Sequence, residues 1–324
     1  MDSGNRIDLR EVMIRTFLRA VEDGVNLAVV VGDSTSTSKI APFRERYPNR
    51  VIDVGIAEQN LVGVAVGLSL GGFVSVTANA APFLIARSNE QVKNDVCYTE
   101  SNVKLLGLNA GVCYGPLGST HHAIDDLSIM QGLGNILILA PSDPVEAEQI
   151  LHFALTHTGP VYVRMDSGKF PILHDDQYRF EPGAVDVLKQ GSDVTLAAVG
   201  SAVYEAFFAA LDLEKAGISA EVLNVSSIRP LRRGAVAESI RKTAAVVTVE
   251  EHSLHGGLGS LVSEIIAEQG LSARIKRLGL TGGEFSKAGP RAEIRAYYGI
   301  DQTGIRKAAL DLLDRGDVGG EKEG

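Results

Sequence analysis

The sequence predicts a two-domain α/β protein in which each domain is a mostly parallel sheet with helices on both faces. Three observations lead to this fold class. Short runs such as NLAVVVGD and NILILAPSD are apolar throughout, as buried parallel strands are. Stretches with apolar residues at helical spacing lie between these runs, which is the alternation of an α/β fold. The length of 324 residues is enough for two domains of ordinary size.

The first half of the chain alternates strands and helices regularly. Its apolar pattern predicts, in order, a helix over 9–23, strands over 26–33 and 51–55, a helix over 61–72, a strand over 73–78, a helix over 85–98, and strands over 103–111 and 135–143. The Ser-Asp-Pro sequence at 142–144 is a typical helix start and predicts a helix over 145–157. The run GPVYVRM then predicts the last strand of this half.

The alternation is interrupted once and then resumes. Residues 171–190 contain prolines, an acidic pair and little periodicity, which predicts a linker between a first domain of residues 1–170 and a second of residues 191–316. In the second domain, the runs DVTLAAVG, AEVLNVSSI, AAVVTVEE and IKRLGL predict strands. The glycine-rich, charged tail over 317–324 predicts disorder.

Composition excludes several functional classes. A hydrophobic content of 45% with 22% charged residues is typical of a soluble globular protein. The net charge of -9 argues against nucleic-acid binding, although a small phosphorylated ligand needs only a few local cations. The sequence contains neither a signal peptide nor an apolar run of membrane-spanning length. The two cysteines show no metal-binding spacing, so we expect free thiols, no metal held by this chain, and a cytoplasmic protein.

Polar side chains follow the apolar strands, where the ligands of open parallel sheets collect. They occur in GDSTSTSK, GIAEQN, the loop GSTHHAIDD and VYVRMDSGK. Glu58 in GIAEQN is the most informative, because it stands between an apolar strand and an apolar helix. A carboxylate there either suits the dipole of the first helical turn or faces a ligand that shares a proton with it.

Four segments together resemble the C-terminal half of transketolases. They are GIAEQNLVGVAVGL, GSTHHAIDDLSIM, PSDPVEAEQI and VTVEEHSLHGGLGSLVSEII. The resemblance implies a pyrimidine-binding domain followed by a transketolase C-terminal domain, and an enzyme that uses thiamine diphosphate to transfer a two-carbon ketol unit. The GDG motif that marks the diphosphate-binding domain of this family is not in the sequence. The resemblance therefore implies a split enzyme, in which an N-terminal partner subunit holds magnesium and the diphosphate, with an α2β2 assembly and a small sugar or keto substrate.

The resemblance also implies roles for single residues. Glu58 matches the glutamate that hydrogen-bonds the aminopyrimidine nitrogen of the cofactor, and a desolvated pocket would let it share a proton near neutrality. His121 matches a histidine that contacts donor oxygens. Arg164 matches an arginine that binds substrate phosphate, but a strand-end arginine paired to an acid is an equal alternative. Asp33 matches a carboxylate near the cofactor, and Thr37 lies near a position that touches phosphate.

The wall expected to hold the cofactor ring departs from the family pattern. Ala78 and Ala81 stand where the family has two aromatic residues that stack on the pyrimidine. The loss of one such stack costs about 1 kcal/mol of affinity. Phe83 is the alternative aromatic residue, if the backbone after Pro82 is shifted.

The wall expected to hold the substrate departs as well. Leu117 replaces an aspartate that recognises a donor hydroxyl, Asn109 replaces a histidine, and His122 replaces a glutamine. An apolar side chain cannot accept the hydrogen bond of a hydroxyl, so we expect a non-standard donor. Two alternatives stay open: the β subunit of a 2-oxo-acid dehydrogenase, and a non-catalytic scaffold subunit.

Overall fold

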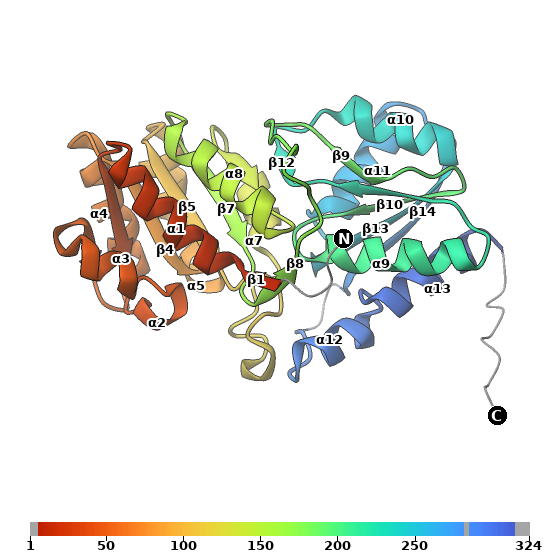
Figure 1. Cartoon of the computed structure of the whole chain (residues 1–324), viewed down its shortest axis with the longest axis horizontal. Coiled ribbons are helices and arrows are strands. Elements are labelled where there is room, and N and C mark those ends of the chain that lie inside the picture. The colour runs from red at the N-terminus through yellow and green to blue at the C-terminus, as the bar shows by residue number, and fades with distance from the viewer. Residues whose placement is uncertain (1–5, 282–284, 315–324) are drawn as a thin grey trace.

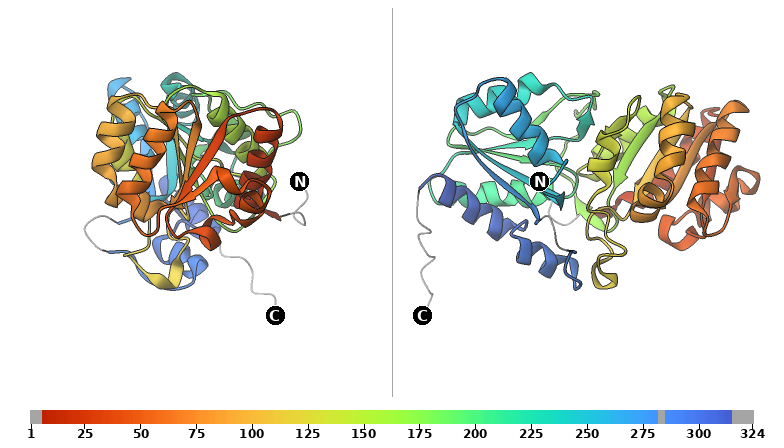
Figure 2. Two further views of the ribbon diagram at one scale, coloured as in Figure 1. Left: turned by 90° about the vertical axis from the view of Figure 1, so that its left-hand side faces the viewer. Right: turned by 180° about the vertical axis from the view of Figure 1, so that it is seen from behind.

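The computed structural model describes residues 6–281 and 285–314 and confirms the α/β fold class. Two sheets lie side by side along the long axis of the molecule, one built mainly from the first half of the chain and one from the second (Figure 1). Seen from behind, helices cover the second face of each sheet too (Figure 2). The predicted disordered tail over 317–324 lies outside the described residues.

The first sheet has seven strands in the order β12-β6-β7-β5-β4-β2-β3. The strands are β2 (Leu27–Val31), β3 (Val51–Asp53), β4 (Val74–Ala80), β5 (Val103–Leu108), β6 (Leu137–Leu139), β7 (Val161–Met165) and β12 (Ser227–Arg229). All neighbouring pairs are parallel except β12 with β6. The carboxyl ends of β2, β3, β4, β5 and β7 therefore face one edge of the sheet.

Helices pack on both faces of this sheet. They are α1 (Leu9–Glu22), α2 (Thr35–Ser38), α3 (Ala41–Arg46), α4 (Glu58–Leu70), α5 (Ala81–Arg87), α6 (Asn89–Gln91), α7 (Asp126–Gln131) and α8 (Pro144–Thr156), with a π-helical segment over Val92–Tyr98. α1 and α8 share one apolar core with the sheet, whereas α4 and α5 belong to a second core on the other face. α8 begins as its sequence predicts, because the Asp143 side chain accepts a hydrogen bond from the Glu146 N–H and Pro144 follows it.

The second sheet has five strands in the order β14-β13-β10-β11-β9. The strands are β9 (Asp186–Lys189), β10 (Val194–Ala198), β11 (Ala220–Asn224), β13 (Ala245–Ser253) and β14 (Arg274–Leu280). The helices around it are α9 (Ala202–Lys215), α10 (Arg233–Thr243), α11 (Leu258–Glu268), α12 (Arg291–Tyr298) and α13 (Gln302–Leu312). Strand β9 lies within the predicted linker and pairs antiparallel with β11 at the edge of this sheet.

The run AEVLNVSSI does not form the single strand that its apolar character predicts. It forms β11 in the second sheet and then β12, which pairs antiparallel with β6 at the edge of the first sheet. Between the two strands the chain changes partner: the Val225 N–H donates to Ala198 O, and Ser226 O accepts from the Ala140 N–H. Apolar character predicts burial, but it does not identify the sheet in which a strand is buried.

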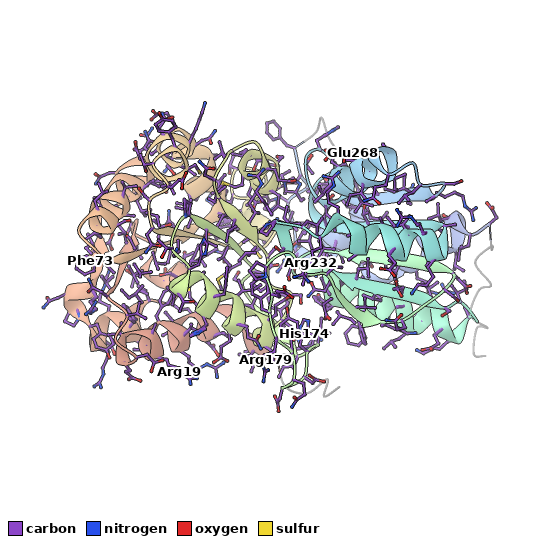
Figure 3. The ribbon with its side chains drawn as sticks, turned by 90° about the horizontal axis from the view of Figure 1, so that it is seen from above. Arg19, Phe73, His174, Arg179, Arg232 and Glu268 are labelled. Carbon is purple, nitrogen blue, oxygen red and sulfur yellow. The ribbon has the colours of Figure 1, made fainter. Side chains whose placement is uncertain are left out.

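Two further features of the junction were not predicted. β1 (Arg6–Asp8) pairs antiparallel with β8 (Lys169–Pro171), which ties the N-terminal residues to the end of the first domain. His174, near the middle of the molecule, lies between two carboxylates, with Nδ1 3.1 Å from Asp143 Oδ1 and Nε2 3.1 Å from Asp186 Oδ2 (Figure 3). Burial would lower the pKa of His174, but these carboxylates outweigh it and raise the pKa to about 10.

Candidate active site

Glu58 begins α4 at the carboxyl edge of the first sheet, and its residue is only 2% exposed. The carboxylate is held by two side chains. Oε1 accepts a hydrogen bond of 3.3 Å from Asn79 Nδ2, at the end of β4. Oε2 accepts a hydrogen bond of 2.5 Å from Arg87 Nη1, at the end of α5. These contacts satisfy the requirement that a buried carboxylate has partners, and they leave two of its roughly four lone-pair sites for a ligand.

An aromatic group lies beside this carboxylate. The Phe83 ring is half-buried, and the Arg87 guanidinium lies 5.2 Å from its centroid. Phe83 also meets the His121 ring edge to face, at 5.2 Å between centroids and 82° between planes. The Tyr114 ring lies 5.6 Å from His121 on the same loop. The structure therefore brings Glu58, Phe83 and His121 into one connected cluster.

The two alanines do not belong to this cluster surface. Ala78 and Ala81 are fully buried, each with an exposed fraction of 0%. Ala78 belongs to β4 and Ala81 begins α5, and both are too short to reach beyond the backbone that buries them. Phe83 is the aromatic side chain that the backbone after β4 presents next to Glu58.

The neighbouring histidines of the loop have different surroundings. His121 is partly exposed and has Nδ1 3.0 Å from Thr120 Oγ1. His122 is 4% exposed and points to the second domain, with Nδ1 2.6 Å from Ser286 Oγ. Leu117 is 56% exposed at the tip of the same loop. Only His121 faces the cluster around Glu58.

Two more of the predicted residues follow strands at this edge. Asp33 follows β2 with φ 51°, and its N–H donates to Asp53 Oδ1. Asn109 follows β5 with φ 56° and is 4% exposed. These backbone conformations suit Asp and Asn, which tolerate the left-handed region better than most residues.

Next to Asp33 is an open cavity of about 670 Å³. Its lining includes Asp33, Thr35, Ser36 and Lys39. Thr37 is not part of that lining, and its carbonyl accepts a hydrogen bond from Arg10 Nη1. The hydroxyl-rich stretch after β2 therefore contributes Thr35 and Ser36 to the cavity rather than Thr37.

Arg164 is buried, with an exposed fraction of 2%. Its Nε donates to both oxygens of Asp126, at 2.8 Å and 3.1 Å, and its Nη2 donates to the carbonyls of Ala123 and Glu251. The geometry is that of a strand-end arginine paired to an acid. The guanidinium joins the two domains and does not open onto the cluster around Glu58.

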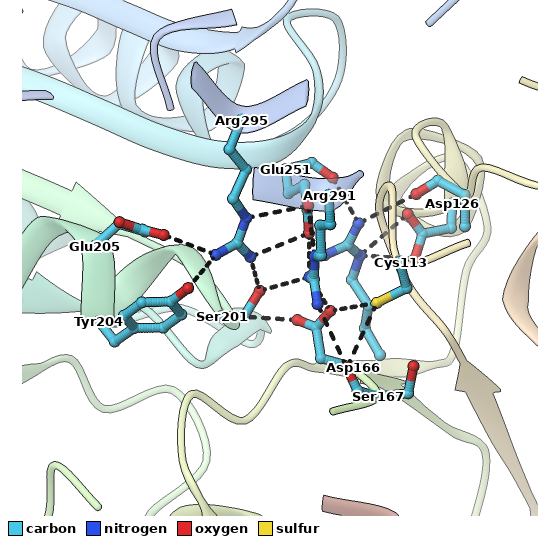
Figure 4. A network of polar contacts seen from close by, with 12 residues as sticks. Cys113, Asp126, Asp166, Ser167, Ser201, Tyr204, Glu205, Glu251, Arg291 and Arg295 are labelled. Carbon is cyan, nitrogen blue, oxygen red and sulfur yellow. Dashed lines mark hydrogen bonds and ion pairs between the residues drawn. The ribbon is translucent and has the colours of Figure 1, made fainter. Parts of the chain in front are cut away.

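A buried polar network continues this junction (Figure 4). Arg291 on α12 bonds both Asp166, after β7, and Glu251 on β13. Burial would raise the pKa of Asp166, but Arg291 and Arg164 hold that pKa well below its usual value. The Cys113 thiol donates to Asp166 Oδ1 at 2.9 Å, and burial raises its pKa. A thiol with a raised pKa is not a nucleophile, so Cys113 is a structural residue of the loop.

Asn79, Arg87 and Tyr114 were not identified from the sequence. The signal for Asn79 was available, since an amide at the end of a buried apolar strand requires a partner. Arg87 could not be found in that way, because an arginine at the end of a helix is ordinary. Its contact with Glu58 depends on the angle at which α5 leaves β4.

The chemical groups of the cluster fit one end of thiamine diphosphate. A buried carboxylate can hold the aminopyrimidine nitrogen, and an adjacent aromatic ring can cover the face of the heterocycle. Within residues 6–281 and 285–314, no group of His, Cys, Asp and Glu side chains could hold a metal ion. No helix within the same residues has the length and apolar character needed to cross a membrane.

The fold and this cluster define a domain pair of the thiamine diphosphate-dependent enzymes, and the chain belongs to the transketolase family. Residues 5–171 match the transketolase pyrimidine binding domain, and residues 183–305 match the transketolase C-terminal domain. Transketolases depend on thiamine diphosphate, so the predicted cofactor class is confirmed at the level of the family.

The similarity to split transketolases extends over almost the whole chain. The chain is 52% identical over 308 residues to an apulose-4-phosphate transketolase subunit of Actinobacillus succinogenes, which covers 95% of this chain and 99% of the relative. An apulose-4-phosphate transketolase subunit from Phocaeicola vulgatus is 35% identical over 314 residues, covering 97% and 100%. A solved structure described as a split gene transketolase, inactive β4 tetramer, superimposes with a TM-score of 0.84 at 35% identity, covering 96% of this chain and 99% of that one.

Proposed function

We propose that this chain is the pyrimidine-binding subunit of a split transketolase, active only with a diphosphate-binding partner subunit, and that apulose 4-phosphate is its ketol donor. The observation that carries the proposal is the cluster of Glu58, Phe83 and His121 at the carboxyl edge of the first sheet. The donor is proposed from the 52% identity to a relative named for that sugar phosphate.

Each residue of the cluster has a separate task. Thiamine diphosphate, when bound, supplies the carbon nucleophile that takes up the two-carbon unit. Glu58 holds the aminopyrimidine nitrogen and shares a proton with it, while Asn79 and Arg87 fix the orientation of the carboxylate. Phe83 covers one face of the ring. His121 donates to a donor oxygen on which negative charge develops.

The groups around the cluster suit a phosphorylated donor. Thr35, Ser36 and Lys39 give the adjacent cavity hydroxyls and a cation, which are ordinary partners of a sugar phosphate. Leu117 presents an apolar side chain where most transketolases have an aspartate. We propose that Leu117, together with Asn109, selects against the common ketose phosphates.

The remaining parts of the site come from a second kind of subunit. The proposed partner holds magnesium and the diphosphate, in an α2β2 heterotetramer. Two observations support this: the described residues lack a metal-binding cluster, and a related chain forms a β4 tetramer described as inactive. The two free cysteines, Cys97 and Cys113, support a cytoplasmic location.

The test is a donor panel on the assembled complex with thiamine diphosphate and magnesium. Apulose 4-phosphate should give the highest kcat/KM, and the chain alone should be inactive. Leu117→Asp should raise the kcat/KM for xylulose 5-phosphate relative to apulose 4-phosphate. Decarboxylation of a 2-oxo acid in place of ketol transfer would refute the proposed reaction, whereas a clear preference of the native complex for xylulose 5-phosphate would refute the proposed donor.

A further inference from the structure

We propose that Ser286, in the second domain, is a positioning residue for the reaction, because it fixes through His122 and Ser119 the loop that carries His121. The inference rests on the proposed function, in which His121 contacts the donor. Ser286 lies between β14 and α12 and is 8% exposed. It belongs to the C-terminal domain, which contributes no other side chain to the cluster around Glu58 among the described residues.

The hydrogen bonds of the loop indicate what holds it. Residues 114–122 are tied to one another by backbone turns, from Leu117 N–H to Tyr114 O through His121 N–H to Gly118 O. Within the described part of the chain, the hydrogen bonds of this segment that leave the loop end on Ser286 and Gly289. The loop thus depends on the second domain for its position.

The donors and acceptors at Ser286 form one consistent arrangement. The carbonyl of Gly115 lies 3.1 Å from His122 Nε2 and can only accept, so Nε2 carries the proton of a neutral ring. Nδ1 is then an acceptor, and the Ser286 hydroxyl donates to it at 2.6 Å. The Ser119 hydroxyl donates to the Ser286 carbonyl at 2.7 Å. Burial lowers the pKa of His122, which keeps the ring in the neutral form that this arrangement needs.

The backbones also meet closely. A Cβ added to Gly115, which has φ 44°, would come within 2.7 Å of Gly289 O. A Cβ on Gly118, with φ 75°, would meet the Ala288 Cβ at 3.4 Å. The loop therefore lies directly against residues 286–289. A shift of this segment would move the backbone just before His121, and a displacement of about 1 Å can cost up to about 10²-fold in rate.

The test compares Ser286→Ala with Ser239→Ala in the complete complex. Ser239 is a matched control, because it is a serine of the same domain, 5% exposed, with its hydroxyl 2.7 Å from Thr195 Oγ1. We expect Ser286→Ala to lower the donor kcat/KM at least about tenfold and to leave the Kd of thiamine diphosphate within about twofold. Ser286→Thr, which keeps the hydroxyl, should restore most of the loss. Hydrogen exchange in peptides of residues 110–122 should accelerate in Ser286→Ala but not in Ser239→Ala.

The outcomes separate this inference from the proposed function. If the native complex turns over the donor and Ser286→Ala matches Ser239→Ala in donor kinetics, the role of Ser286 is refuted and the function stands. Equal losses of donor turnover and cofactor binding would also refute it, since they indicate a general structural defect. A native complex that transfers no ketol unit would refute the proposed function and this role with it. Exchange in the loop peptides would then report only whether Ser286 holds the loop.

Discussion

Glu58→Gln is the substitution that tests the site most directly. It preserves the shape of the side chain, removes the charge, and replaces one oxygen by an NH₂ group. In the structure both carboxylate oxygens accept hydrogen bonds, one from Asn79 and one from Arg87. An amide can satisfy one of these donors with its oxygen, and its NH₂ group would then face the other. The variant therefore loses a charge-assisted hydrogen bond and gains a contact between two donors.

The expected cost to folding is moderate. A hydrogen bond to a charged group contributes about 1.5–3 kcal/mol. The Arg87 side chain is 46% exposed, so solvent weakens the pair and we expect a loss of about 1–2 kcal/mol in the free energy of unfolding. The expected cost to catalysis is larger, because removal of a proton-sharing group lowers kcat about 10²- to 10⁴-fold.

Urea unfolding of the isolated chain measures the first effect, and kcat of the assembled complex measures the second. Glu90→Gln is the matched control, since Glu90 is exposed on α6 and bonds only neutral amides, those of Gln91 and Asn94. It should change neither quantity appreciably. A Glu58→Gln complex with kcat within about threefold of the native value would refute the assignment of Glu58 as the catalytic carboxylate. An unchanged urea midpoint would show that the pair with Arg87 contributes nothing to stability.

Three other predictions follow from the same contacts. Phe83→Ala should raise the Kd of thiamine diphosphate about five- to tenfold in calorimetric titrations of the complex, because it removes an aromatic contact. Phe73→Ala, at the far end of the first domain, is its control. Arg164→Met should lower the free energy of unfolding by about 3–5 kcal/mol, since it leaves the buried Asp126 without its charge partner. The folded state should lose stability as pH rises, because the pKa of His174 is raised to about 10 from 6.5. That contribution is complete below pH 6.5 and disappears as pH passes 10, as urea midpoints across this range should record.

Each of these has a contrary outcome. Equal effects of Phe83→Ala and Phe73→Ala on cofactor binding would remove Phe83 from the site. A higher donor KM without a loss of stability in Arg164→Met would return Arg164 to the phosphate-binding role that its sequence position suggests. A slope of stability against pH that persists in His174→Gln would assign the titration to another group.

The sequence was sufficient for the elements whose pattern is local. The Ser-Asp-Pro start of α8 and the apolar strands of both sheets follow from residues that are neighbours in the chain. The two-stranded pair of β1 and β8 was missed, because each strand has three residues and neither is apolar throughout. The helix predicted over 85–98 is divided into α5, α6 and a π-helical segment, which residue periodicity does not resolve.

The site shows the same limit at the level of side chains. Glu58 was predicted because a carboxylate at that junction needs a partner. Arg164 looked equally suited to a phosphate and to an acid, and only its contacts with Asp126 distinguish the two. His121 and His122 are adjacent in sequence, yet one faces Phe83 and the other Ser286. Which way each ring points depends on residues more than 30 positions away, which no local pattern contains.

Strand β12 has a consequence for the order in which the protein is made. During synthesis the first domain emerges from the ribosome long before Ser227–Arg229, so the edge of β6 stays unpaired until the second domain follows. An open sheet edge is a template for pairing with another chain. Nascent chains at high concentration are therefore exposed to mispairing at β6, and truncation near residue 170 would make that exposure permanent. A gene that separates the two halves would have to supply the missing strand with the first.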